Sequence, residues 1–141
     1  MPHKSTIADL EASAAPFNIK PADLGLLLNA AVEAKELAYC PYSNFRVGAA
    51  VLPASTRPTP PIVKGANVEN ASYPVGTCAE RCCLSKAVTE GTKREFVALA
   101  VATDVKPADG EFVVKTMQEL LPDSFGPENM GQPQALGDLE G

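Results

Sequence analysis

The chain has 141 residues, which is the size of a single domain. Hydrophobic residues make up 45% of the sequence and charged residues 21%, and these globular proportions exclude a wholly disordered or fibrous protein. The 12 basic and 17 acidic residues give a net charge of −5, and the largest basic cluster is the pair Lys93-Arg94. A polynucleotide partner is therefore not expected, because binding a phosphate backbone requires a basic surface.

The apolar stretches and the cysteines indicate where the protein acts. No apolar stretch is long enough to cross a membrane, and the N-terminus lacks the basic-then-apolar order of a signal peptide. The four cysteines include the adjacent Cys82 and Cys83, which do not resemble the spaced pairs of a secreted disulfide framework. We therefore expect reduced thiols or metal ligands, a cytoplasmic location and no membrane partner.

Both ends of the chain differ in composition from its middle. Residues 1–15 are polar and alanine-rich without sustained periodicity, and residues 131–141 are rich in Gly, Pro and Gln. Both segments are predicted to be flexible. A single domain is predicted over residues 16–130.

The first half of this domain predicts a helix followed by a hairpin. Apolar residues recur at helical spacing from Pro21 to Ala38, and Pro41 ends the pattern. Two apolar runs, Phe45–Leu52 and Ile62–Val68, flank a proline-rich stretch that cannot continue a strand. They predict two strands joined by a long exposed loop.

The second half predicts a helix and a buried strand. Thr77 is a suitable N-cap for a helix over about Cys78–Glu90, and Glu80 three residues later completes a capping-box pattern. The continuous apolar run Phe96–Thr103 predicts a central strand that is buried on both faces. The remaining predicted elements are a short strand and a short helix, over 111–116 and 117–121.

Polar residues that could carry chemistry gather between Asn67 and Arg81, at the predicted start of the second helix. A thiol at Cys78 gains from free backbone N–H groups and from the helix dipole, which favour the thiolate and prepare it for metal binding. Glu80 lies near enough to move a proton between a zinc-bound water and a substrate ring. For these two residues alone, a buried structural cysteine beside a capping glutamate is the commoner arrangement.

Four stretches in one order change that assessment: Asn44-Phe-Arg-Val-Gly-Ala-Ala, Asn67-Val-Glu-Asn-Ala-Ser-Tyr, Cys78-Ala-Glu-Arg and Leu120-Leu-Pro-Asp-Ser-Phe-Gly-Pro. Together they resemble the homotetrameric, zinc-dependent cytidine deaminases over most of residues 22–128. The resemblance implies an α/β fold, built as a three-layer α/β/α sandwich around a mixed sheet. It also implies a Zn²⁺ cofactor, hydrolytic deamination of free cytidine or deoxycytidine in pyrimidine salvage, and a homotetramer.

The resemblance assigns roles to individual residues. Cys78 would bind zinc, Glu80 would be the catalytic proton shuttle, and Arg81 would temper the charge of the zinc thiolates. The remaining residues would belong to the substrate site: Asn67 and Glu69 at the ribose hydroxyls, Phe45 at the pyrimidine, Ala79 nearby, and Tyr73 and Phe125 in a neighbouring subunit's pocket. Taken singly, these residues could instead be turn, core or surface positions.

The chain lacks the Pro-Cys-x-x-Cys motif from which the family takes two of its three zinc ligands. Where the family continues through that motif, its helix and another strand, this chain passes from Lys106-Pro-Ala directly to Asp109-Gly-Glu-Phe. An internal deletion is our hypothesis for the gap. Cys78 alone would lose most of the zinc affinity, and Cys82, one helical turn along, would add only a second ligand.

The missing segment also predicts a weakened fold. Removing a helix and a strand uncovers one face of the sheet and leaves an unpaired edge, so we expect aggregation or reliance on a partner subunit. Three hypotheses remain: a cytidine deaminase with impaired activity, a catalytically inactive chain that associates with full-length deaminase subunits, and a chain that is not a stable product.

Overall fold

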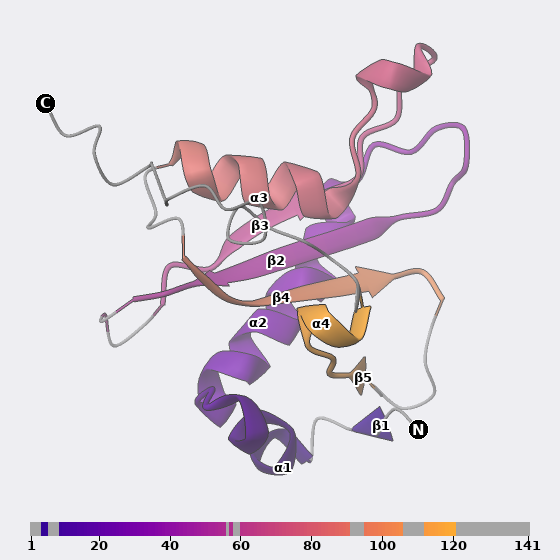
Figure 1. Ribbon diagram of the computed structural model, residues 1–141. Coiled ribbons are helices and arrows are strands. Elements are labelled where there is room, and N and C mark those ends of the chain that lie inside the picture. The colour runs from indigo at the N-terminus through magenta and orange to yellow at the C-terminus, as the bar shows by residue number, and fades with distance from the viewer. Residues whose placement is uncertain are drawn as a thin grey trace, which may run out of the picture. The chain divides into compact units, whose positions relative to one another are not determined.

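Figure 1 shows the computed structural model, which describes residues 4–5, 9–55, 57, 60–90, 95–105 and 112–120. The chain divides into two compact units, residues 5–112 and residues 1–4 with 113–141. The larger unit contains a three-stranded sheet with helices on both of its faces.

The sheet has the strand order β3-β2-β4. The central strand β2 (Val47–Pro53) pairs antiparallel with β3 (Val63–Ala66) on one side and with β4 (Phe96–Thr103) on the other. From Gly48 to Pro53 every residue of β2 is buried. Because both pairings are antiparallel, the described strands of this sheet show no parallel pair of the mixed sheet that the resemblance implied.

Helix α3 (Ala79–Thr89) covers one face of the sheet. Its Cys83 and Ala87 pack with Ala49 and Val51 of β2 in one buried apolar cluster. Side chains alternate between the two faces of a strand, so Ala50 and Leu52 of β2 point away from α3.

Helix α2 (Pro21–Ala34) covers the opposite face (Figure 1). The helix begins at Pro21, as predicted, because proline suits the first helical position. The second buried cluster contains Leu27, Ala31, Ala50, Leu52 and Ala100. Helices on both faces of one sheet confirm the predicted α/β class and its α/β/α layering.

The N-terminal part of the larger unit contains a helix that the sequence did not predict. Helix α1 (Leu10–Ala14) contacts α2, and its Ser13 and Ala14 are buried. The structure thus has a helix within the stretch that was predicted to be flexible. One turn and a half is too short to show periodicity, and the helix is stabilised by contacts with a distant element rather than by its own sequence.

Strand β4 differs from its prediction. The run was expected to be buried on both faces, but Val97, Leu99 and Val101 remain 49%, 41% and 46% exposed. β4 lies at the edge of the sheet, and α3 packs mainly over β2 and β3. The apolar side chains on one face of β4 therefore remain about half-exposed.

The element ends also differ from the predictions. The predicted helix to Ala38 stops at Ala34 and continues as a 3-10 turn, η3 (Lys35–Leu37). The predicted N-cap Thr77 is wrong by one residue, because Cys78 caps α3 and its sulfur accepts a hydrogen bond from a backbone N–H. Glu80 accordingly does not complete a capping box with Thr77.

The remaining described elements, within residues 4–5 and 112–120, are short. Strand β5 (Phe112–Val113) pairs with β1 (Lys4–Ser5). Helix α4 (Met117–Leu120) begins where predicted, with a reciprocal capping box between Thr116 and Glu119. Phe125 and the predicted tail lie outside the described residues. None of the described helices has the length and apolar character needed to cross a membrane.

Candidate functional site

A short extended segment after β3 organises the polar residues. Val68 forms a parallel bridge with Tyr39 and an antiparallel bridge with Thr77. The N–H of Val68 donates to the carbonyl of Thr77 at 3.0 Å, and the N–H of Thr77 donates back at 2.9 Å. Tyr39 bonds to the backbones of Asn67 and Glu69, at 3.0 and 2.8 Å. The backbones of Asn67 and Glu69 are thus fixed beside the start of α3.

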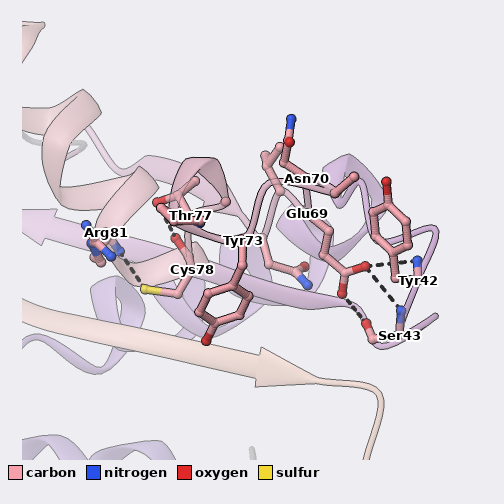
Figure 2. A pocket seen from close by; sticks show the side chains of 13 residues that line it. Tyr42, Ser43, Glu69, Asn70, Tyr73, Thr77, Cys78 and Arg81 are labelled. Carbon is pink, nitrogen blue, oxygen red and sulfur yellow. Dashed lines mark hydrogen bonds between the residues drawn. The ribbon is translucent and has the colours of Figure 1, made fainter.

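A cavity of about 770 Å³ opens beside this segment (Figure 2). Its lining comes from Tyr42 and Ser43, from residues between 67 and 78, and from Arg81 in the first turn of α3. Small-molecule sites usually measure about 300–1,000 Å³. The cavity therefore has the volume of a site for a small molecule.

The Glu69 carboxylate accepts three hydrogen bonds at one side of this cavity. The Ser43 hydroxyl donates to Oε1, and the backbone N–H groups of Tyr42 and Ser43 donate to Oε2 at 3.0 and 3.1 Å. These bonds, first of all the one from the Ser43 hydroxyl, lower the pKa of Glu69 below its ordinary value although partial burial opposes the shift. Glu69 is therefore held as an anion.

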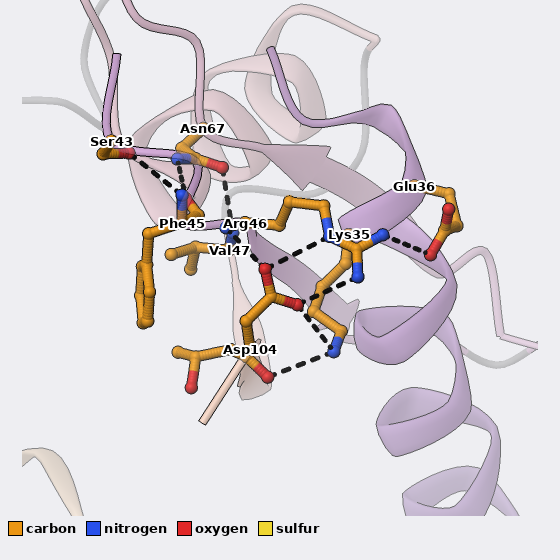
Figure 3. Close-up of polar contacts among 9 residues, drawn as sticks. Lys35, Glu36, Ser43, Phe45, Arg46, Val47, Asn67 and Asp104 are labelled. Carbon is orange, nitrogen blue, oxygen red and sulfur yellow. Dashed lines mark hydrogen bonds and ion pairs between the residues drawn. The ribbon is translucent and has the colours of Figure 1, made fainter. Parts of the chain in front are cut away.

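Asn67 bonds to the start of β2 (Figure 3). Its Oδ1 accepts a hydrogen bond from the N–H of Val47 at 2.9 Å, and its Nδ2 donates to the carbonyl of Phe45 at 2.9 Å. An amide side chain has two donor hydrogens and two acceptor lone pairs. Asn67 therefore keeps one donor hydrogen and one acceptor lone pair for another molecule.

Cys78 lies at the opposite side of the cavity from Glu69 (Figure 2). Its thiol is exposed, and Sγ accepts a hydrogen bond from the N–H of Arg81 at 3.4 Å. A thiol at this N-cap position meets the positive end of the helix dipole. Cys78 therefore lies at the N-terminus of α3 with its sulfur facing the backbone N–H of Arg81.

The other cysteines do not join Cys78 in a metal site. Cys83 is buried, its thiol donates to the carbonyl of Val63 at 3.0 Å, and burial raises its pKa to about 11. Cys82 is half-buried one helical turn from Cys78. Within the described part of the chain, no group of three or more His, Cys, Asp or Glu side chains could hold a metal ion.

The structure brings together only part of the predicted site. The predicted residues that line the cavity are Asn67, Glu69, Tyr73, Cys78 and Arg81. Phe45, Ala79 and Glu80 do not line it: Phe45 is 40% exposed, Ala79 is fully buried and Glu80 is half-buried in the first turn of α3. Phe125 lies outside the described residues.

Ser43 was missed by sequence reasoning. It follows Pro41 in a stretch of turn-forming residues, and a short polar residue in such a stretch is ordinary. Its contact with Glu69 joins residues 26 positions apart, so no local pattern reveals it.

Comparison with known proteins identifies the family. Residues 23–114 match the cytidine and deoxycytidylate deaminase zinc-binding region. The chain belongs to this family. A cytidine deaminase from Halalkalibacterium halodurans is 39% identical over 134 residues, covering 77% of this chain and 98% of that protein. A probable cytidine deaminase from Dictyostelium discoideum is 44% identical over 84 residues, which span 60% of this chain and 54% of that protein.

Solved deaminase structures have the same fold. The cytidine deaminase of Burkholderia pseudomallei superimposes with a TM-score of 0.60 and 34% identity, covering 71% of this chain and 97% of the other. The cytidine deaminase of Mycobacterium tuberculosis gives a TM-score of 0.57 at 31% identity, with 74% and 98% covered. The resemblance deduced from four sequence stretches is confirmed.

Zinc belongs to this family of deaminases, so the fit of this chain to the metal can be tested by its donors. A catalytic zinc site needs three protein ligands and an open position. Cys78 offers one exposed sulfur, but the described residues place no second and third donor beside it. The donors that the described residues supply therefore do not fit the family's metal.

Proposed function

We propose that this deaminase-family chain binds a free pyrimidine nucleoside in the cavity and that its own deamination activity is impaired. The observation that supports the proposal is a contrast within one cavity: polar side chains that suit a sugar line it, whereas the described residues bring no further metal donors to Cys78.

The hydrogen-bonding capacity of Glu69 and Asn67 favours a sugar hydroxyl as the ligand. A carboxylate has about four acceptor positions, and three of those of Glu69 are used within the chain. Asn67 keeps one donor and one acceptor. A ribose hydroxyl both donates and accepts, so it can satisfy both residues at once.

The charges around the cavity favour a neutral nucleoside over a nucleotide. Among the described residues of the lining, Arg81 is the one cation, and it lies on the side of Cys78, whereas Glu69 is an anion. A phosphate would meet the repulsion of Glu69 without a cluster of cations to offset it. The roles of Phe45 and Ala79 at the base and of Glu80 as proton carrier rest on the resemblance.

Impairment follows from the ligand count. In zinc deaminases the metal activates the water that attacks the ring, and a glutamate moves the protons. This chain keeps that glutamate as Glu80, but its zinc affinity should be low with one thiolate in place.

The length of one alignment supports an internal deletion. The match to the Halalkalibacterium halodurans protein runs over 134 aligned positions. It covers 77% of the 141 residues of this chain, which is only about 109 residues. The alignment therefore contains residues of that relative that have no counterpart here. This agrees with a lost segment that carried the Pro-Cys-x-x-Cys motif.

A second candidate is an inactive subunit that assembles with full-length deaminase chains. Tyr73 lines the cavity and is 92% exposed, so this aromatic side chain is available to a neighbouring subunit. We propose assembly into homotetramers or mixed oligomers and a cytoplasmic location on the same basis of family resemblance.

The test combines zinc analysis, calorimetry with cytidine and a cytidine absorbance assay. We expect less than one zinc per chain, cytidine binding, and turnover close to the uncatalysed rate. Glu80→Ala should remove any residual turnover without weakening cytidine binding, whereas Glu11→Ala, on the exposed side of α1, should change neither.

Two outcomes would contradict the proposal. One zinc per chain with turnover that Glu80→Ala abolishes would mean that the chain rebuilds the metal site and is a working deaminase. Absence of cytidine binding would exclude the nucleoside site.

A further inference from the structure

The Ser43 hydroxyl donates one hydrogen bond and accepts another. It donates to Oε1 of Glu69 and accepts a hydrogen bond from the N–H of Phe45 at 3.1 Å (Figures 2 and 3). The backbone N–H of Ser43 also donates to Oε2 of Glu69 at 3.1 Å. Ser43 therefore joins the cavity's carboxylate directly to the segment that carries Phe45.

Asn67 holds the same segment from its other end. It accepts from the N–H of Val47 and donates to the carbonyl of Phe45. The N–H and the carbonyl of Phe45 are thus both bonded, one to Ser43 and one to Asn67. The position of the Phe45 backbone depends on the two side-chain anchors together.

The turn between these anchors has an unusual backbone. Asn44, between Ser43 and Phe45, has φ of 53°, in the left-handed region. Asparagine tolerates this region better than most residues, but it is still sparsely populated. The bonds on both sides of Asn44 are what keep the segment in this conformation.

We propose that Ser43 is a positioning residue that ties the anionic Glu69 to the Phe45 segment, so that the carboxylate is oriented toward the sugar of a bound nucleoside. This inference rests on the proposed nucleoside site. Ser43 acts through Glu69 and Phe45 rather than through the reacting atoms.

Because Ser43 is exposed, its substitution can weaken ligand binding without lowering the stability of the fold. Ser43 and the carboxylate bonds lie at the surface, so water can replace the lost hydroxyl in the unliganded protein. Ser43→Ala should therefore leave the urea midpoint of unfolding nearly unchanged. The Glu69 carboxylate would lose one of its three donors and become less well oriented for a ligand.

The experiment compares cytidine with the free base cytosine by calorimetry. In Ser43→Ala the preference for cytidine over cytosine should fall about tenfold, which is the loss expected for one hydrogen bond to a charged group. Ser43→Thr keeps the hydroxyl and should restore the preference. Ser85→Ala, a matched change at an exposed position of α3, should leave it unaltered.

The pH dependence gives a second readout. The Ser43 hydroxyl is the largest cause of the lowered pKa of Glu69, so its removal should raise that pKa. Loss of cytidine affinity on acidification should then begin at a higher pH in Ser43→Ala. Among the described residues of the lining, the other titratable side chains are Tyr42, Tyr73, Cys78 and Arg81, and the substitution leaves all of them in place.

The outcomes are distinguishable. An unchanged preference in Ser43→Ala, equal losses for cytidine and cytosine, or failure of Ser43→Thr to restore the preference would overturn the role of Ser43. If the unsubstituted chain binds neither ligand, the proposed function fails first, and Ser43 has no nucleoside to position.

Discussion

Asp104 is the acceptor of a polar cluster where the end of β4 meets the start of β2 (Figure 3). Arg46 donates to its carboxylate from Nε at 3.2 Å, from Nη2 at 3.0 Å and from the backbone N–H at 2.9 Å. Lys35 lies 3.5 Å from Oδ1. The hydrogen bonds from Arg46, and then the charges of both cations, lower the pKa of Asp104 to about 2. The cluster fixes the segment that leads from Phe45 into β2.

Asp104→Asn should reduce stability at neutral pH. A carboxyl with a lowered pKa stabilises the fold above its ordinary pKa of 3.8, and this contribution is lost as the pH falls toward about 2. The free energy of unfolding in urea should therefore fall between pH 4 and pH 3 more steeply in the unsubstituted protein than in Asp104→Asn.

The control for this prediction is Glu36→Gln. Glu36 accepts a bond from Nη1 of Arg46 at 2.8 Å, but its side chain is 73% exposed. Exposed pairs contribute little to stability. Equal pH slopes for the unsubstituted protein and Asp104→Asn would contradict the role given to Asp104.

Individual residues were predictable to the extent that one motif contains them. Asn67, Glu69 and Cys78 share a short stretch, and the structure places them around one cavity. The hydrogen bonds of Ser43 and Asp104 reach partners 26 and 58 positions away. Such pairs are set by the fold, and local sequence carries no sign of them.

At the scale of elements, two glycines determine how closely the layers approach. A Cβ atom on Gly65 of β3 would lie 2.5 Å from the backbone nitrogen of Cys83, and one on Gly48 of β2 would lie 2.3 Å from the carbonyl oxygen of Ala31. Neither contact can be relieved by rotating a side chain. The two helices therefore pack directly against the backbone of the sheet.

Gly65→Ala should destabilise the protein by about 1–3 kcal/mol, because α3 must move away from the sheet. Gly25→Ala is the matched control. Its Cβ would meet the flexible end of Leu10 at 3.2 Å, and alanine favours the helix, so this change should be neutral or stabilising by up to about 1 kcal/mol. Urea unfolding measures both, and equal effects would contradict the close packing of α3.

The spacing of apolar residues predicted which segments are helices and which are strands, but it did not predict how deeply each is buried. The helix from Pro21 and the paired strands on either side of the proline-rich stretch were predicted correctly. Phe96–Thr103 is a strand, yet its burial on both faces was predicted wrongly. An apolar run shows which segment prefers burial, whereas neighbouring elements decide how much burial it obtains.

At the scale of the whole molecule, the uncovered face of β4 is the main structural liability. Val97, Leu99 and Val101 present a half-exposed apolar surface on a strand at the edge of the sheet. Apolar edge strands of this kind promote association between chains. We therefore expect the protein to self-associate as its concentration rises.

The double substitution Val97→Thr with Val101→Thr tests this expectation. Threonine keeps the β-branched shape that suits a strand and adds a polar group to each half-exposed position. Light scattering at high concentration should decrease, and the free energy of unfolding should change by no more than about 1 kcal/mol.

Val32→Thr is the control, because Val32 is 55% exposed but lies on α2. It should leave the scattering unchanged. Equal scattering from the double variant and the unsubstituted protein would show that association does not involve β4.

The sequence by itself determined the family, the α/β class and the chemical groups around Cys78, because these depend on residue types in a fixed order. It also showed that the Pro-Cys-x-x-Cys motif is absent, which can be seen directly from the order of residues. Only the tertiary structure decided that Ser43 holds Glu69, that β4 lies at an edge and that α1 is folded. Each of these depends on contacts between segments far apart in the chain, and such contacts form only when the layers pack.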